Sequence, residues 1–303
     1  MTFRRMKNPL VYRLSQFIAF LMGAKVFVTL LLTFALYVST FFLFNQEESL
    51  REFVFDLRVH GIIFCTILSV LAGGIINQFY DREKDQITKP FRTKLQNFLK
   101  QKYFLYAYLI LNLFSLTLAV LISERVFIFF LIYQFLMWFY SHKLSKILVL
   151  NNITFVGLTL YPFFGMLVYY RTLSLYIILL SVFIFLMLLI IDIIKDTLTK
   201  NADKIFGYAT IPNSFSQKIT RYLLVFLLIS VMVTCGCIIY IKGLGSIMSY
   251  YFAISILVQI VSVFLILIKV KNGKFLNLNL MRIWIFIGIL AMLANGIKSY
   301  YFY

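Results

Sequence analysis

Three oxygen-bearing side chains recur at every fourth residue in the segment Asn77-Gln-Phe-Tyr-Asp81-Arg-Glu-Lys-Asp85, which closes an apolar stretch. On an α-helix a step of four residues advances only about 40° beyond a full turn, so Asn77, Asp81 and Asp85 share one face. A second acidic group closes another apolar stretch far along the chain and consists of Asp192, Asp196 and Asp203. The spacing therefore predicts two stripes of oxygen ligands at helix ends.

Carboxylates that gather in one site repel one another, so a positive charge has to lie between them. Protons, lysines or metal ions can supply that charge. Carboxylate and amide oxygens without His or Cys suit a hard cation such as Mg²⁺, which typically binds one or two carboxylates, several waters and substrate phosphates. Nearby Lys and Arg side chains can neutralise phosphate oxygens that the metal does not reach. The residue types favour a site for a Mg²⁺-bridged diphosphate.

The helices that carry these stripes belong to a chain with the composition of a membrane protein. Of its 303 residues, 62% are hydrophobic and 13% are charged, whereas soluble proteins carry roughly a quarter charged residues. Nine apolar stretches are long enough to cross a bilayer as helices, at about 17–44, 59–79, 103–122, 125–140, 150–169, 173–194, 222–241, 248–268 and 279–297. We expect an all-α, integral, multi-pass membrane bundle.

The net charge of +18 could suggest a nucleic-acid partner, but the basic residues follow the membrane instead. The amino terminus (Arg4, Arg5, Lys7 and Arg13) and the segments 82–102, 143–146, 195–221 and 269–282 together carry 22 of the 29 lysines and arginines. The positive-inside rule places these segments, and both acidic stripes, on the cytoplasmic side. The excess charge also favours anionic lipid head groups or an anionic substrate. We expect membrane lipid as a partner and no nucleic acid.

Each stripe is followed by basic residues and a proline. After the first stripe, Pro90 is expected to break the helix and to leave the cations beyond it on a loop that folds back over the stripe. The second stripe is followed by a basic segment that reaches Pro212. This common order suggests an internal repeat, 17–140 and 150–297, within a single domain of residues 1–303.

Other residues of reactive type have structural interpretations. Cys65, Cys235 and Cys237 fall within apolar spans and lack the spacing of redox or metal sites. His60 stands alone near the start of the second span and is interpreted as a packing residue. Lys25 lies within the first span, where its side chain either extends toward the cytoplasm or faces the interior of the bundle.

The first stripe and its tail, Lys89-Pro90-x-Arg92, resemble the first signature of the UbiA family of membrane prenyltransferases, in which NxxxDxxxD precedes a basic residue, a proline and an arginine. Tyr140-Ser141-x-Lys143 is similar to the family's tyrosine-serine-lysine turn. The spacing of the family's second aspartate-rich signature is matched by Asp192, Asp196, Asp203, Gly207, Thr210 and Pro212. The resemblance covers nearly the whole chain. It departs at Thr199, where the family usually has an aspartate.

From the apolar stretches and the basic segments we expect about nine transmembrane helices in the cytoplasmic membrane of a prokaryote, with the amino terminus on the cytoplasmic side. The resemblance implies that these helices form an all-α bundle around a central cavity whose mouth lies on the cytoplasmic side. It implies Mg²⁺ held by Asn77, Asp81, Asp85, Asp192, Asp196 and Asp203, with Asp81, Asp85, Asp192 and Asp196 as catalytic residues. It also implies an isoprenoid diphosphate donor that contacts Asn77, Lys89, Arg92, Tyr140, Ser141, Lys143 and Lys146. The prenyl group would pass to a lipophilic or amphipathic acceptor. The form of the first signature points toward members that act on glycerol phosphate lipids or chlorophyll precursors.

Two other functions are compatible with these residues. A membrane terpene cyclase would use the same diphosphate site without an acceptor, because the cation would close on double bonds of its own chain. An ion-coupled transporter would use the acids to carry a cation or proton. Transporter sites usually lie near the middle of the bilayer, whereas both stripes are predicted at helix ends.

Overall fold

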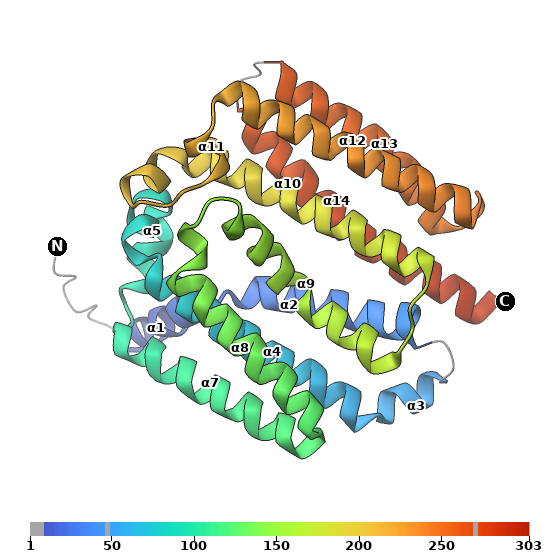
Figure 1. Cartoon of the computed structure of the whole chain (residues 1–303). Helices are drawn as coiled ribbons and strands as arrows, with labels where there is room; N and C mark the ends of the chain where they lie inside the picture. Colours follow the sequence, from blue (N-terminus) through green and yellow to red (C-terminus); the bar gives the residue numbers. More distant parts are fainter. Residues whose placement is uncertain (1–8, 46–48, 269–271, 303) are drawn as a thin grey trace. The chain divides into compact units, whose positions relative to one another are not determined.

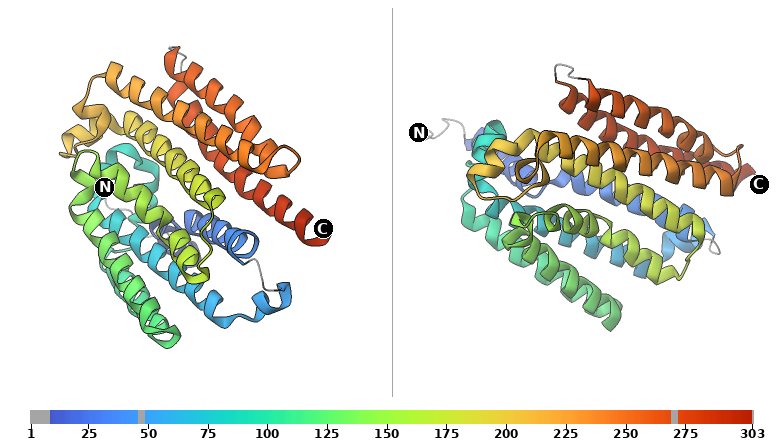
Figure 2. Two further views of the ribbon diagram at one scale, coloured as in Figure 1. Left: turned by 45° about the vertical axis from the view of Figure 1, so that its right-hand side comes forward. Right: turned by 45° about the horizontal axis from the view of Figure 1, so that its top comes forward.

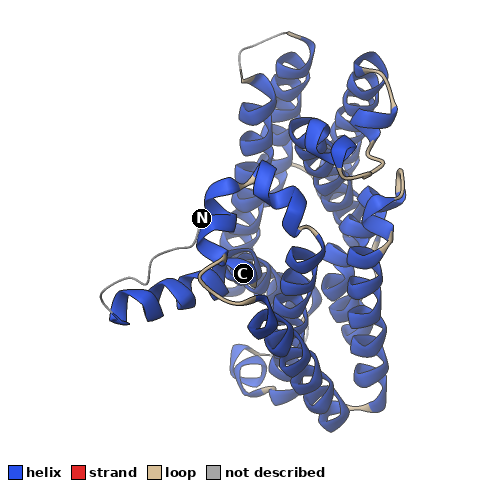
Figure 3. Ribbon diagram, turned by 90° about the vertical axis from the view of Figure 1, so that its left-hand side faces the viewer, coloured by secondary structure: helices blue, strands red, loops and turns tan. Residues whose placement is uncertain are grey.

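The computed structural model describes residues 9–45, 49–268 and 272–302, and the regular elements in this part of the chain are all helical (Figure 3). The predicted all-α class is confirmed. Some basic residues on which the predicted orientation depends lie outside the described residues, namely Arg4, Arg5, Lys7, Lys269 and Lys271. The charge pattern at those positions stays a prediction.

The chain divides into two compact units, one of Met1–Tyr37 with Glu48–Leu144 and the other of Val38–Glu47 with Ser145–Tyr303. Unit 1 contains α1 (Pro9–Gly23), most of α2 (Val26–Ser39), α3 (Leu50–Phe55), α4 (Leu57–Tyr80), α5 (Arg82–Thr88), α6 (Pro90–Gln96), α7 (Gln101–Ile122) and α8 (Glu124–His142). Unit 2 contains the π-helical turn η1 (Thr40–Phe44), most of the 3₁₀ turn η2 (Leu144–Lys146), α9 (Leu150–Tyr170), α10 (Leu175–Ile205), α11 (Ile211–Ser214), α12 (Gln217–Lys242), α13 (Ile247–Leu267) and α14 (Gly273–Phe302). Each unit holds one acidic stripe.

In unit 1, α4 packs along α7 and α8 (Figure 1). Helix α1 packs on α6. Small and polar side chains allow α4, α7 and α8 to approach one another. Ser69 and Ser115 share a hydrogen bond of 3.0 Å between their hydroxyls, and the Gln134 amide donates to Ser69 at 3.2 Å. Helices in lipid are held together by such polar contacts and by close packing. The first stripe follows from the end of α4, the helix at the centre of this arrangement.

In unit 2, α10 contacts α12 and α14, and α13 contacts both α12 and α14 (Figure 2). The Trp284 indole of α14 donates to the Ser255 hydroxyl of α13 at 3.0 Å, and the Tyr251 ring stacks on Trp284. A buried indole needs a partner of this kind for its N–H. The packing supports the long helix α10, whose last four turns carry the second stripe.

Eight helices in the described residues are long and apolar enough to cross a membrane. They correspond to eight of the nine predicted spans, and α8, which replaces the predicted span 125–140, is not among them. The predicted span 17–44 is also divided. It forms α1 and α2 because the backbone at Lys25 adopts a left-handed conformation, with φ of 54°. Such a conformation cannot continue an α-helix of L-residues.

The prediction of a loop after Pro90 is wrong. Pro90 begins a new helix, α6, so Arg92 and Lys94 lie on a helix. Proline suits the first position of a helix because its φ is preset and its missing N–H would have no intrahelical acceptor there. The chain bends before Pro90, at Lys89, where φ and ψ are −139° and 57°. The proline therefore ends one helix and starts another instead of starting a loop.

Candidate active site

The first stripe spans a joint between two helices. Helix α4 ends at Tyr80, Asp81 forms the joint, and α5 carries Asp85. The backbone keeps its helical register through this joint, because the Asp81 N–H donates to the Asn77 carbonyl at 3.0 Å and the Asp85 N–H donates to the Asp81 carbonyl at 2.8 Å. The four-residue spacing that the sequence predicts is thus preserved. Asn77, Asp81 and Asp85 follow one another at single helical turns.

Lys25 completes the first stripe from the joint between α1 and α2. Its ammonium donates to Asn77 Oδ1, and Asn77 Nδ2 donates to Asp81 Oδ2 at 3.0 Å. The sequence left the direction of Lys25 open, and the structure places it on the stripe. The left-handed backbone at Lys25 turns the chain where this contact is made. Asn77 thereby connects a lysine to an aspartate.

Asp85 is buried, with 5% of its surface exposed, and its partners are basic or hydroxylic. The Lys89 ammonium lies 2.8 Å from Asp85 Oδ1, and the Thr88 hydroxyl donates to the same oxygen at 3.4 Å. Arg92 Nη2 donates to the Met22 carbonyl at 2.6 Å, while its buried Nε has no hydrogen-bond partner among the described residues. Burial lowers the pKa of the Arg92 guanidinium, and the charge of Asp85 opposes that shift. Both predicted diphosphate-binding cations of this segment therefore lie around Asp85.

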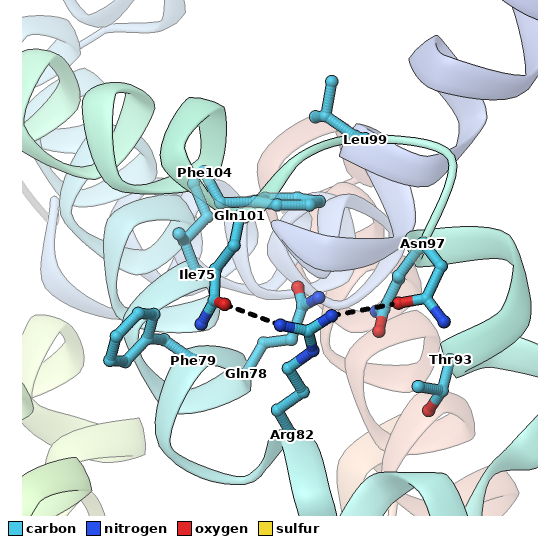
Figure 4. A pocket seen from close by; sticks show the side chains of 10 residues that line it. Ile75, Gln78, Phe79, Arg82, Thr93, Asn97, Leu99, Gln101 and Phe104 are labelled. Carbon is cyan, nitrogen blue, oxygen red and sulfur yellow. Dashed lines mark hydrogen bonds between the residues drawn. The ribbon is translucent and has the colours of Figure 1, made fainter. Parts of the chain in front are cut away.

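Arg82, the residue after Asp81, supports the joint from outside the stripe. Its guanidinium donates to Gln101 Oε1 at 2.6 Å and to Asn97 Oδ1 at 3.4 Å (Figure 4). These contacts connect the start of α5 to the residue after α6 and to the first residue of α7. A guanidinium with two separate acceptors holds the direction of its own helix more firmly than a single contact would.

The second stripe is held by an asparagine that sequence reasoning missed. Asp192 and Asp196 are buried on α10, and Asn152 from the first turn of α9 donates through Nδ2 to both, at 2.7 Å to Asp192 and 2.9 Å to Asp196. Lys195 forms an ion pair with Asp192. Asn151 and Asn152 stand side by side at the start of an apolar span, and that polar pair is the signal in the sequence that could have found the contact.

Thr199 has a defined partner in the second stripe. Its hydroxyl donates to Asp203 Oδ2 at 2.7 Å, and Asp203 is fully buried. On α10, Asp196, Thr199 and Asp203 succeed one another at intervals of three and four residues and share a face. A carboxylate at position 199 would repel Asp203, whereas the threonine hydroxyl stabilises it. The departure from the family signature therefore has a local structural role.

Only part of the predicted basic turn, residues 140–146, contacts the segment around a stripe. Tyr140 and Ser141 lie at the end of α8, where the buried Ser141 hydroxyl donates to the Met137 carbonyl at 3.0 Å. Lys143 is exposed. Lys146 connects the turn to the segment after Asp203, because its carbonyl accepts from the Ala209 N–H at 3.1 Å and its ammonium lies 5.4 Å from the centre of the Tyr208 ring.

The side chains of the stripes suit Mg²⁺ better than a softer metal. Within the described residues, no group of three His, Cys, Asp or Glu side chains gathers in one place. In unit 2 the carboxylates of Asp192 and Asp196 meet the amide of Asn152, whose buried Oδ1 has no hydrogen-bond partner in the described structure. Two carboxylates and an amide form the incomplete oxygen set that Mg²⁺ extends with water and phosphate.

The sequence of this chain matches a known protein family. The profile of the UbiA prenyltransferase family matches residues 50–286, a range that contains both stripes. The chain belongs to the UbiA prenyltransferase family. It is therefore an integral, multi-pass membrane enzyme of the prenyltransferase class, as predicted.

Two relatives of this UbiA-family chain are digeranylgeranylglyceryl phosphate synthases. The protein from Methanosphaera stadtmanae is 31% identical over 234 residues, which cover 76% of this chain and 84% of the relative. The protein from Pyrococcus furiosus is 29% identical over 166 residues, which cover 54% of this chain and 59% of the relative. The second alignment thus spans less than two thirds of that relative's length.

Solved structures show the same fold. A digeranylgeranylglyceryl phosphate synthase structure superposes with a TM-score of 0.71 at 21% identity and covers 93% of this UbiA-family chain and 99% of its own. A UbiA homolog from Archaeoglobus fulgidus, bound to GPP and Mg²⁺, superposes with a TM-score of 0.65 at 15% identity and covers 91% of this chain and 99% of its own. At these identities the structural likeness establishes the fold alone.

Proposed function

We propose that this enzyme uses Mg²⁺ to ionise an isoprenoid diphosphate and transfers the prenyl group to the hydroxyl of a glycerol phosphate lipid. The observation that carries the proposal is the bridge from Asn152 to Asp192 and Asp196, because it gathers an oxygen-only ligand set at a predicted diphosphate-binding motif. Membership of the family supports the class of reaction. The acceptor is suggested by the relatives' activity, since a digeranylgeranylglyceryl phosphate carries two prenyl groups on one glyceryl phosphate.

The metal-binding residues in this proposal are oxygen ligands of both stripes. They are Asn77, Asp81 and Asp85 in unit 1, and Asp192, Asp196 and Asp203 in unit 2. Bound Mg²⁺ would stabilise the negative charge that develops on the leaving diphosphate as its bond to the allylic carbon breaks. Asn152 would hold the Asp192 and Asp196 carboxylates in place, as residues behind metal ligands generally do.

The remaining predicted residues would bind the diphosphate. Lys89 forms an ion pair with Asp85, and the charge of Asp85 acts on Arg92. Both observations support a role for these cations in neutralising oxygens of a diphosphate near the first stripe. Tyr140, Ser141, Lys143 and Lys146 are assigned the same task. After the carbon–oxygen bond breaks, the acceptor hydroxyl would attack the allylic carbon and release its proton, which yields an ether. We place the site, with the amino terminus, on the cytoplasmic side of a prokaryotic membrane.

The test is a transfer assay with the purified full chain in detergent. Geranylgeranyl diphosphate and geranylgeranylglyceryl phosphate are supplied with Mg²⁺, and the ether product is measured by mass spectrometry. We expect product formation that stops when the metal is chelated. We expect Asp81→Asn and Asp192→Asn to lower turnover by about 100-fold or more, as loss of groups that stabilise transition-state charge typically does.

Each other outcome identifies a different function. Hydrocarbon formed from the diphosphate alone, equally well without acceptor, would indicate a terpene cyclase. Unchanged turnover in both aspartate variants would rule out the metal sites as assigned. Transfer to an aromatic acceptor in preference to the glycerol phosphate lipid would keep the donor chemistry and overturn the acceptor.

A further inference from the structure

A cavity of about 260 Å³ lies in unit 2, at the end of the unit away from the second stripe. Its lining includes Tyr176, the second residue of α10, and Lys242, the last residue of α12. Sixteen residues of α10 separate Tyr176 from Asp192, which at 1.5 Å per residue is about 24 Å along the helix. The cavity is therefore separate from the proposed diphosphate site.

The lining of the cavity is amphipathic. Its polar members are Lys242, Ser246, Ser249 and Asn295, and its apolar members include Phe252 and Met292. The loop between α12 and α13 is short and turns at Gly243, whose φ is 72°. Ser246 therefore follows soon after Lys242 in the sequence. The Ser246 hydroxyl accepts from the Ser249 N–H at 3.0 Å, so both serines stand at the start of α13. Polar and apolar groups thus share one small cavity.

Lys242 gives this end of the unit a positive charge. Its ammonium lies 4.7 Å from the centre of the Tyr176 ring. In the described part of unit 2, the carboxylates are Asp192, Asp196 and Asp203, and all three belong to the second stripe. No described carboxylate at this end neutralises the lysine. A phosphate group would offer the Lys242 ammonium an anionic partner.

The level of the cavity in the bundle points to the source of that phosphate. Helix α12 ends at Lys242, α13 begins at Ile247, and α10 begins at Leu175, so three membrane-spanning helices end or start beside the cavity. The ends of such spans lie at the depth of lipid head groups. Lipid phosphates are the anions that are present there at high concentration.

We propose that this cavity binds the phosphate-bearing head group of an anionic phospholipid. Lys242 pairs with the phosphate, Ser246 and Asn295 offer hydrogen bonds to the head group, and the acyl chains leave the cavity along the apolar side chains. Phe252 and Met292 form part of that apolar side. The site does not depend on the proposed transfer reaction. A bound lipid would hold the end of unit 2 that lies away from the second stripe at the level of the lipid head groups.

The proposal is tested by native mass spectrometry of the full chain after removal of co-purified lipid. The protein in detergent is incubated with equal amounts of phosphatidylglycerol and phosphatidylcholine, and the ratio of the two lipids bound is measured. We expect wild-type protein to prefer phosphatidylglycerol and Lys242→Gln to lower the bound ratio by about fivefold, the factor typical of one basic residue near anionic lipid. Lys242→Glu should reverse the preference while the protein stays folded by circular dichroism.

Lys218→Gln is the matched control, because Lys218 also lies over a tyrosine, 5.8 Å from the centre of the Tyr222 ring, at the other end of the same helix. We expect this variant to keep the wild-type lipid ratio. An equal loss in Lys218→Gln and Lys242→Gln would overturn the proposal, since any surface lysine would then serve. Displacement of the bound lipid by inorganic phosphate would also overturn it and indicate a site for a free anion.

Discussion

At the scale of single residues, each stripe has an asparagine amide that donates to its carboxylates. Asn77 Nδ2 donates to Asp81, and Asn152 Nδ2 donates to both Asp192 and Asp196. An amide donor orients a carboxylate without adding charge to it. Lysine ammonium groups supply positive charge next to the carboxylates. Lys25 donates to Asn77, and Lys195 forms an ion pair with Asp192.

Asn152→Leu removes the bridge between two buried carboxylates. We expect the half-saturating Mg²⁺ concentration of the transfer reaction to rise by about 10- to 100-fold, the usual effect of losing a residue that orients metal ligands. The measurement is a Mg²⁺ titration of activity. Asn277→Leu is the control, because Asn277 is a buried asparagine of the same unit that bonds to Ser262 and lies outside the stripe. A similar Mg²⁺ dependence in both variants would contradict the role of Asn152.

Thr199 offers a second test at this scale. Thr199→Val removes the hydroxyl that donates to the buried Asp203, and we expect it to lower stability by about 1–3 kcal/mol, the range for a buried acceptor that loses its donor. Thr199→Ser keeps the hydroxyl and should stay close to wild type. Thermal unfolding in detergent measures both variants, and equal unfolding temperatures for the two would refute the role of this hydrogen bond.

The sequence predicts local parts of the stripes and misses their distant partners. The four-residue spacing of the aspartates is a property of one helix, so it could be recognised without a structure. Asn152 lies 40 residues before Asp192, and Lys25 lies 52 residues before Asn77. Their contacts depend on which helices pack together, and nothing in the local pattern specifies that packing. The metal and diphosphate roles of the stripe residues stay predictions.

At the scale of helices, the close approach of α4 to the joint between α1 and α2 determines where Lys25 lies. A Cβ atom on Gly74 of α4 would come within 2.8 Å of the Ala24 carbonyl oxygen. That oxygen belongs to the backbone and cannot rotate away like a side chain. The glycine therefore allows the joint to lie one turn before Asn77, within reach of the Lys25 side chain.

Gly74→Ala is expected to push the joint away from α4 and to weaken the contact between Lys25 and Asn77. We expect a loss of about 1–3 kcal/mol in stability, as for other substitutions that overpack a core, together with lower transfer activity. Gly157→Ala in α9 is the control, because a Cβ atom there would meet nothing within 4 Å. Unfolding temperature and turnover are measured for both. Equal behaviour would show that the joint tolerates displacement.

Helix boundaries were predicted well where composition changes sharply and poorly where backbone conformation decides. The predicted spans 173–194 and 222–241 match the start of α10 and the end of α12 within two residues, because apolar segments meet polar ones there, whereas α10 continues past the predicted end to Ile205. No proline and no long polar segment indicates the break at Lys25, so the sequence predicts a single span over 17–44. Pro90 was recognised as a boundary, but proline is compatible with both the end and the start of a helix.

At the scale of the whole molecule, the distribution of basic residues predicts the orientation in the membrane. Ser214 and Leu244 are exposed residues just beyond the two ends of α12, so they should lie on opposite sides of the bilayer. In a cysteine-free background, Leu244→Cys should react with an impermeant maleimide in intact cells. Ser214→Cys should react only after the cells are opened. The reverse pattern would place both stripes on the outer side.

The comparison with known proteins confirms the class of enzyme that the signatures indicated, and the structure confirms a helical chain with spans of membrane length. The proposed internal repeat stays a prediction. Donor chain length and acceptor were beyond the sequence for a physical reason. They depend on the shape that large side chains give to a binding site, and 18% aromatic residues leave too many candidates to choose among.

The burial of the second stripe has a consequence for how the chain enters the bilayer. A helix with an aspartate at its centre loses about 2.5–3.5 kcal/mol of insertion free energy on biological scales. Helix α10 has 31 residues and contains the most apolar window among the eight candidate spans, and its aspartates are confined to its last 14 residues. The apolar turns that precede the aspartates can therefore insert into the membrane first. Packing of α9 beside its acidic end then brings Asn152 to Asp192 and Asp196.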